Sequence, residues 1–421
     1  PDGSALALVA VPGSGIAPLV AVEPVAPVVT TRADGGTVLD NGLLRVTLDA
    51  RGLITSIVDL RHADRELVPA GRAANLLQLH EDIPTAWDAW DVDAHYRASR
   101  TDLVDAASVE LVEDSELRAT VEVVRQFGRS RIVQRVSLHA DDARIHATAD
   151  LDWLEDEKLL KVTFPLTIHA QHHSAEIQFG HVRRPTHTNT SWDEARFEVM
   201  AHRFVHVEEP GYGVALTNAQ SYGHDITRSV GATGEVETEL RISLVRAARS
   251  PDPVQDIGHH RFEYALVPGV GIEGAVDAGL EQNLPVRVVR PGTATDASAA
   301  VAAPSAVGSA PASDAAVPSS LPTAAGLVSV HGGTVRIEAL KLADDGSGDV
   351  IVRLYESTGA RAATRLEAHL AADRFTEVDV LERPLGEGFP RSIAFEPEAD
   401  GRGVRLVLRA FQVITLRIHR A

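Results

Sequence analysis

Residues 84–97 gather side chains that suit recognition of a sugar. This stretch holds two of the four tryptophans of the chain, together with three aspartates, a histidine, a tyrosine and an arginine. Aromatic faces stack on the apolar faces of sugar rings, while carboxylates accept hydrogen bonds from vicinal hydroxyls. Composition alone favours a plainer alternative, a Trp-anchored loop whose Asp side chains cap its own turns. Spacing cannot assign carboxylate pairs for glycoside hydrolysis, and Asp88 with Asp91 is the one pair that we nominate from the sequence.

A second cluster, residues 179–193, combines paired arginines with two histidines and a tryptophan in a turn-rich stretch. Arg183 and Arg184 could clamp an anionic group, or they could brace a loop through Arg–Asp pairs. Because Asp193 and Glu194 follow directly, bracing is the favoured interpretation.

Histidines are dense at residues 169–173 and again at His259 and His260. On a strand, His169 and His173 would share one face, but the residues upstream supply no carboxylate as a third metal ligand. The sequence therefore predicts surface or core-edge roles for these histidines, and we assign no metal ligand to the chain.

Several classes of function lack support in the sequence. The 421 residues carry 40 Lys and Arg against 59 Asp and Glu, a net charge of −19, which argues against a nucleic-acid or anionic-membrane partner. The absence of cysteine excludes thiol nucleophiles and Cys-ligated metals. No apolar run approaches the roughly 18 residues of a membrane span. The sequence contains no Walker loop, no strand–GxGxxG–helix, no GxSxG elbow and no HExxH.

The elements that must position these residues are strands. In the stretch 144–153, alternate residues from Ile145 to Trp153 are apolar and the residues between them are polar, which is the two-residue period of a half-buried strand. Further strands are predicted at residues 43–48, 119–127, 131–138, 213–216, 240–246, 335–340, 350–355, 403–408 and 413–418. Many short strands with almost no long amphipathic helix predict an all-β, antiparallel sandwich architecture.

Composition divides the chain into four parts. Residues 291–326 are dominated by Ala, Ser, Pro, Thr and Val without periodicity, so they predict a linker. This linker would separate a large β-sandwich, residues 38–290, from a terminal β-domain, residues 327–421. Residues 1–37 are expected to be the end of a preceding β segment whose beginning is absent.

Several stretches resemble the C-terminal half of family 38 glycoside hydrolases, the class II α-mannosidases, and in particular the cytosolic and bacterial type. The matching stretches are residues 39–46, 87–93, 179–181, 184–193, 195–199, 211–216, 222–223, 243–247, 352–356 and 411–413. The resemblance runs from about residue 38 to the end, apart from the predicted linker.

The resemblance implies a parent enzyme that is a retaining exo-α-mannosidase acting on terminal α-linked mannose. Its Zn²⁺, or another divalent ion, and its nucleophile would belong to an N-terminal catalytic domain, so we place no catalytic residue and no metal ligand on this chain. The chain would be a large super-β-sandwich of the galactose-mutarotase-like type followed by a smaller β-sandwich, inactive alone. Its expected partners are mannosides or oligosaccharides and the missing catalytic domain, and the resemblance also implies cytoplasmic location and a possible homo-oligomer.

The resemblance also implies which residues touch the substrate. In the family an Arg at the end of one strand helps to build the sugar pocket, and Arg246 stands at the similar position. Trp87, Asp88, Trp90 and Asp91 form the second candidate for the rim. The main alternative is a non-catalytic carbohydrate-binding module with Trp87 and Trp90 as its platform, and a third is a structural spacer or oligomerisation domain.

Overall fold

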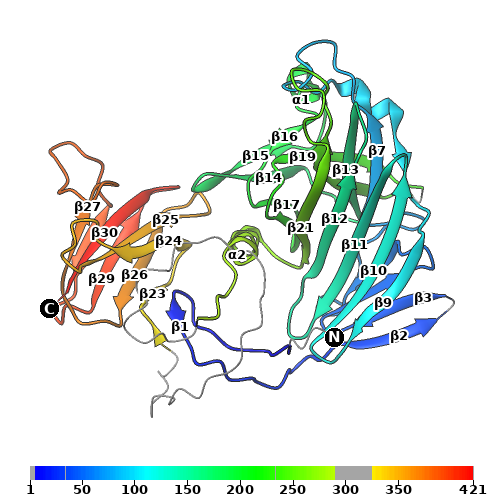
Figure 1. The fold of residues 1–421 in the computed structure, drawn as a ribbon. Helices are drawn as coiled ribbons and strands as arrows, with labels where there is room; N and C mark the ends of the chain where they lie inside the picture. Colours follow the sequence, from blue (N-terminus) through cyan, green and yellow to red (C-terminus); the bar gives the residue numbers. More distant parts are fainter. Residues whose placement is uncertain (1–4, 34, 233, 290–324, 421) are drawn as a thin grey trace.

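The computed structural model describes residues 5–33, 35–232, 234–289 and 325–420 (Figure 1). Strands dominate these residues, and neighbouring strands of the large sheets are antiparallel. This confirms the predicted all-β class with a large sandwich followed by a smaller one.

Two large sheets face each other in the first sandwich, and a third sheet adjoins them. The nine-stranded sheet has the spatial order β15 (Gly180–Pro185), β14 (His172–Ile177), β17 (Phe204–Glu209), β18 (Tyr212–Asn218), β21 (Gly258–Pro268), β12 (Ile145–Trp153), β11 (Ser130–His139), β10 (Arg118–Phe127) and β9 (Ser108–Asp114). The six-stranded sheet has the order β16 (Val199–Met200), β19 (Gly223–Val230), β20 (Val236–Arg246), β13 (Lys158–Leu166), β7 (Leu76–Glu81) and β8 (Thr101–Asp102). The five-stranded sheet has the order β2 (Val29–Ala33), β3 (Gly36–Asp40), β4 (Leu44–Leu48), β5 (Ile54–Asp59) and β6 (Arg65–Glu66).

One apolar core joins the three sheets. Strand β12 shows how the sequence builds it, because alternate residues from Ile145 to Trp153 are buried, as the two-residue period predicts. Burying each large aliphatic or aromatic side chain stabilises the fold by about 1.5–3 kcal/mol. The core is therefore a rigid support for the side chains at the ends of its strands.

Strand β13 departs from this alternation, because nearly all of it is buried on both faces. The 3₁₀ helix η1 (Ala94–Ser99) covers its outer face and inserts the buried ring of Tyr96 there. The cover places the side chain of Lys161 in the interior, although it points away from the apolar core.

The second sandwich consists of two four-stranded sheets with a separate core. Their orders are β23 (Val328–His331), β26 (Ala362–Ala368), β29 (Gly403–Leu408) and β28 (Ala394–Pro397), and β24 (Val335–Leu342), β25 (Val350–Glu356), β30 (Val413–Arg420) and β27 (Ala372–Val378). Helix α2 (Ile272–Asn283) packs on β17 and β18 and lies between the sandwiches (Figure 1), where Arg336 Nε is 2.5 Å from Asp277 Oδ1. A further α-helix, α1 (Ser191–Glu194), forms a single turn.

A two-stranded ribbon pairs β1 (Gly15–Ile16) with β22 (Ala325–Gly326). Most of the predicted linker, residues 291–326, lies outside the described residues, and the four predicted domain boundaries stay predictions. Among the described residues, no helix combines the length and the apolar composition that crossing a bilayer requires.

Candidate functional site

Arg246 ends strand β20 and holds the loop that contains Trp87 and Trp90. Its Nε lies 2.5 Å from Oδ2 of the buried Asp82. Its Nη2 donates to the backbone oxygens of Asp88, at 3.1 Å, and Asp91, at 2.6 Å. The structure thus brings together the arginine and the loop that the sequence proposed separately.

A β-bulge decides the face on which Arg246 emerges. Leu159 and Lys161 are two residues apart on β13 and share a face, yet their partners on β20 are Arg246 and Ser243, three residues apart. The register shift between Leu160 and Lys161 accounts for the extra residue. Ser243 and Arg246 therefore point to the same side of the sheet, away from the core.

The Trp87–Asp93 loop agrees only in part with the alternative interpretation, a Trp-anchored loop whose Asp side chains cap its own turns. Asp93 caps its own loop, as that alternative expects, because Oδ2 accepts from the backbone N of Thr85 at 2.6 Å. Asp88 instead binds a different loop, since its Oδ2 accepts from the backbone N of Arg249 at 2.7 Å. Neither Trp87 nor Trp90 anchors the loop, because each is 70% exposed.

A hollow with a volume of about 330 Å³ opens beside Arg246. Its wall is mostly apolar, but the lining also includes the carboxylate residue Glu198, the hydroxyl residues Ser243 and Tyr222, and Arg246 itself. The complete lining is Val92, Leu159, Glu198, Val199, Met200, Tyr222, Gly223, Ser243 and Arg246. A mostly apolar hollow with a few polar groups is the usual form of a site for a small ligand.

Beneath the hollow lies a buried polar group that we call the lysine network: Tyr96, Lys161, Glu198 and Asp225. Lys161 Nζ bonds to Glu198 and lies 2.7 Å from Asp225 Oδ2, and neither Lys161 nor Asp225 is exposed. Tyr96 donates its hydroxyl to Glu198 Oε1 at 2.6 Å. Each buried charge has an opposite partner, so the carboxylate of Glu198 is fixed in place at the hollow.

The lysine network sets the protonation states around it. Burial alone would raise the pKa of Asp225, but the charges of Lys161 and Arg241 outweigh it and hold that pKa well below its ordinary value. Burial and the charge of Asp225 raise the pKa of Tyr96, so its hydroxyl stays a donor. Burial, with Arg241 and Lys161, lowers the pKa of His80 to about 4.

The predicted histidine face is not formed. His169 is exposed and precedes strand β14, whereas His173 is buried within it, because the strand begins only at His172. His259 and His260 lie at the start of β21, where His259 Nδ1 is 3.1 Å from Asp152 Oδ1.

Comparison with known proteins shows the family to which the chain belongs. The model of the glycosyl hydrolases family 38 C-terminal domain matches residues 39–254, and that of the family 38 C-terminal beta sandwich domain matches residues 334–416. The chain belongs to glycosyl hydrolase family 38. It corresponds to the family's C-terminal region, as the sequence predicted.

Curated relatives and solved structures agree with this membership. Over 99% of its own length, the chain is 35% identical to the human protein named alpha-mannosidase 2C1. Over 92% of its own length, it is 28% identical to the yeast alpha-mannosidase. It covers 37% and 35% of these two proteins, and so spans about a third of their length. An alpha-mannosidase structure from Enterococcus faecalis matches 94% of the chain with a TM-score of 0.65 and 16% identity, covering 43% of that chain, which shows the shared fold.

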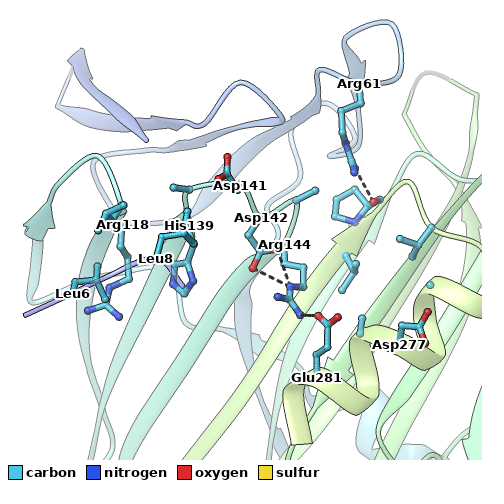
Figure 2. A pocket seen from close by; sticks show the side chains of 18 of the residues that line it. Leu6, Leu8, Arg61, Arg118, His139, Asp141, Asp142, Arg144, Asp277 and Glu281 are labelled. Carbon is cyan, nitrogen blue, oxygen red and sulfur yellow. Dashed lines mark hydrogen bonds and ion pairs between the residues drawn. The ribbon is translucent and has the colours of Figure 1, made fainter. Parts of the chain in front are cut away.

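Family 38 membership raises the question of a metal, and one group of described residues could hold one. Ligand atoms of His139, Asp142 and His146 lie within 4.8 Å of one another. The carboxylate of Asp142 already accepts from Arg144 Nε, at 2.8 Å and 3.0 Å, and Arg144 continues to Glu281, as Figure 2 shows. A cation at this carboxylate would meet the guanidinium, so the group does not fit the Zn²⁺ that the family resemblance implies for the parent enzyme.

The position of this group also separates it from the hollow. His139 and His146 lie where β11 meets β12, whereas Arg246 pairs with Leu159, beyond the far end of β12. The nine residues of β12 span roughly 26 Å.

Sequence reasoning missed Lys161 and Glu198 in this family 38 chain. Glu198 stands within a stretch that carried the resemblance, but without a role, and Lys161 is surrounded by apolar residues on a strand that the sequence did not predict. A lysine inside an apolar run was the available signal, because a buried lysine needs a carboxylate partner.

Proposed function

We propose that this chain is the C-terminal portion of a retaining exo-α-mannosidase that hydrolyses terminal α-linked mannose. It would pack on a catalytic domain and contribute Arg246 and the Trp87–Asp93 loop to the rim of the sugar-binding pocket. The metal and the nucleophile of the parent enzyme would lie outside this chain. Cytoplasmic location and a homo-oligomer stay predictions of the family resemblance.

One observation carries the proposal. Arg246 is braced by a buried carboxylate while it holds a loop with two exposed tryptophans, next to the carboxylate of Glu198. Exposed aromatic rings beside fixed polar groups suit the stacking and hydrogen bonding that a saccharide needs.

Replacing Arg246 by Ala in the intact enzyme tests the rim. We expect kcat/KM for an aryl α-mannoside to fall by about tenfold or more, because one charge-assisted contact is lost and the loop is released. Arg249→Ala is the matched control, since the Arg249 side chain is 59% exposed and lies 3.8 Å from its carboxylate partner, Glu157. An unchanged kcat/KM in Arg246→Ala would remove this residue from the pocket.

The exposure of Trp87 and Trp90 also favours a second candidate, a non-catalytic carbohydrate-binding module. Glycan-array binding by residues 1–421 alone, abolished by Trp87→Ala, would support the module. Binding that needs the catalytic domain would support the rim.

A further inference from the structure

A larger cavity, of about 600 Å³, lies where the edges of the two main sheets meet. Strands β14 and β15 of the nine-stranded sheet and β19 of the six-stranded sheet contribute to it, together with η1 and residues 186–199. Four arginines and two histidines line it: Arg97, Arg184, Arg196, Arg228, His173 and His187. We call it the arginine cavity.

The cavity is positive within an acidic chain. Its four arginines share the lining with two acidic residues, Asp193 and Glu194, and Arg97 also lies 3.8 Å from Asp225, whereas the chain as a whole carries a net charge of −19. Asp193 already accepts from Thr190 Oγ1 at 2.8 Å and lies 3.9 Å from Arg196. Charge of this kind, concentrated against the overall trend, favours an anionic ligand.

Several donors of the cavity lack a partner. Arg184 Nη1 and Arg97 Nε are buried without a hydrogen bond in the part of the chain that the structure describes, as are both ring nitrogens of His173. Arg184 therefore does not form the Arg–Asp brace that the sequence favoured. Buried donors without partners are uncommon and costly, so a missing acceptor is the natural explanation.

The electrostatics agree with a missing negative charge. Burial and the nearby charge of Arg196 lower the pKa of Arg184. Burial and the charge of Arg184 lower the pKa of His173 to about 3, so this imidazole is neutral at pH 7 and has one proton to donate.

We propose that the arginine cavity binds a tetrahedral oxyanion, the phosphoryl group of a sugar phosphate. Arg97, Arg184 and Arg228 reach the cavity from η1, β15 and β19, and planar forks arriving from separate elements suit an anion that accepts in several directions. The volume leaves room for a sugar ring, and Thr188 and Asn189 offer hydroxyl and amide groups to it. This inference is independent of the rim proposed around Arg246.

Calorimetric titration of the full chain with three probes tests the proposal: mannose 6-phosphate, inorganic phosphate and mannose, at fixed ionic strength. We expect the sugar phosphate to bind more tightly than inorganic phosphate, and mannose alone not to bind in this cavity. No measurable binding of either phosphate at millimolar concentration would overturn the proposal. Equal affinities for the two phosphates would overturn the sugar part and leave a site for free phosphate.

Two adjacent arginines provide matched variants. Arg184→Gln should weaken binding of the phosphate-bearing probes by about tenfold or more, because a charge-assisted contact is lost. Arg183→Gln should change it less than twofold, since Arg183 is exposed and does not line the cavity. Arg228→Gln repeats the test from a different strand in case Arg184→Gln does not fold, and equal losses in Arg183→Gln and Arg184→Gln would overturn the proposal.

Discussion

The lysine network and the arginine cavity bury cations in opposite ways. Lys161 is completely buried, and two carboxylates and two hydroxyls meet its ammonium group. Arg184 is partly buried, and its Nη1 finds no acceptor among the described residues. Desolvating a charge costs several kcal/mol unless partners compensate. The lysine network is therefore complete in itself, whereas the arginine cavity lacks an acceptor for Arg184 among the described residues.

Removing the lysine tests the first half of this comparison. Lys161→Met leaves the carboxylates of Asp225 and Glu198 without their shared cation, so we expect the free energy of unfolding to fall by about 3–5 kcal/mol. Urea unfolding of the full chain, followed by tryptophan fluorescence, measures the loss. Lys158→Met on the same strand is the control and should cost less than about 1 kcal/mol, because its partner Glu81 is largely exposed. Similar losses in the two variants would show that the network does not depend on its buried charge.

Buried histidines adjoin both regions, which gives a test by pH: His80 and His224 beside the lysine network, and His173 in the arginine cavity. The pKa of His80 is lowered to about 4 and that of His173 to about 3, against about 6.5 in the unfolded chain. Because the pKa values in the folded chain are lower, the contribution of each neutral histidine to the free energy of unfolding is fully present above about pH 6.5. It is lost as the pH falls toward the pKa of the folded chain. In this pH window, each histidine should lower the free energy of unfolding by about 1.4 kcal/mol for every unit by which the pH falls.

Chemical unfolding measured at several pH values between 4 and 7 checks this slope. His80→Gln and His173→Gln should each reduce the proton uptake on unfolding by about one. Phosphate should diminish the contribution of His173, because a bound anion favours its protonated form, and leave that of His80 unchanged. A phosphate effect on both histidines would contradict the distinction between the regions.

Replacing Arg184 by Met should have the smallest effect and the opposite sign. We expect a gain of about 1 kcal/mol in phosphate-free buffer, because an unpartnered buried cation is removed. Inorganic phosphate should then raise the melting temperature of the unchanged protein but not of Arg184→Met, as scanning calorimetry can measure. A loss as large as that of Lys161→Met would mean that the guanidinium is already satisfied.

The sequence predicted alternating strands such as β12, and it also predicted β18, an apolar run that is buried on both faces. Strand β12 alternates because one face meets the core and the other meets solvent. Strand β13 was missed because it shows neither alternation nor an uninterrupted apolar run, since Lys161 and Thr163 stand between its apolar residues although both are buried. Helix α2 was missed as well, since Ala and Gly fill much of its buried side and give a weak apolar stripe.

The candidate site was predictable only in part. Family resemblance pointed to Arg246, and composition pointed to the loop with Trp87 and Trp90. The lysine network joins residues far apart in the chain, for Lys161 is 37 residues from Glu198 and 65 from Tyr96. Sheet topology brings them together, and no local pattern reports it.

The bulge opposite Leu160 and Lys161 has a consequence for insertions and deletions. The extra residue shifts the in-and-out alternation of the last residues of β20 by one position. Arg246 therefore points outward, although Ile242 points into the apolar core. Loss of a single residue at this point would restore the ordinary two-residue rhythm. Arg246 would then still pair with Leu159 on the outer face, whereas a regular pairing of all the residues present would turn its guanidinium toward the apolar interior, away from Asp82 and from the tryptophan loop that it holds.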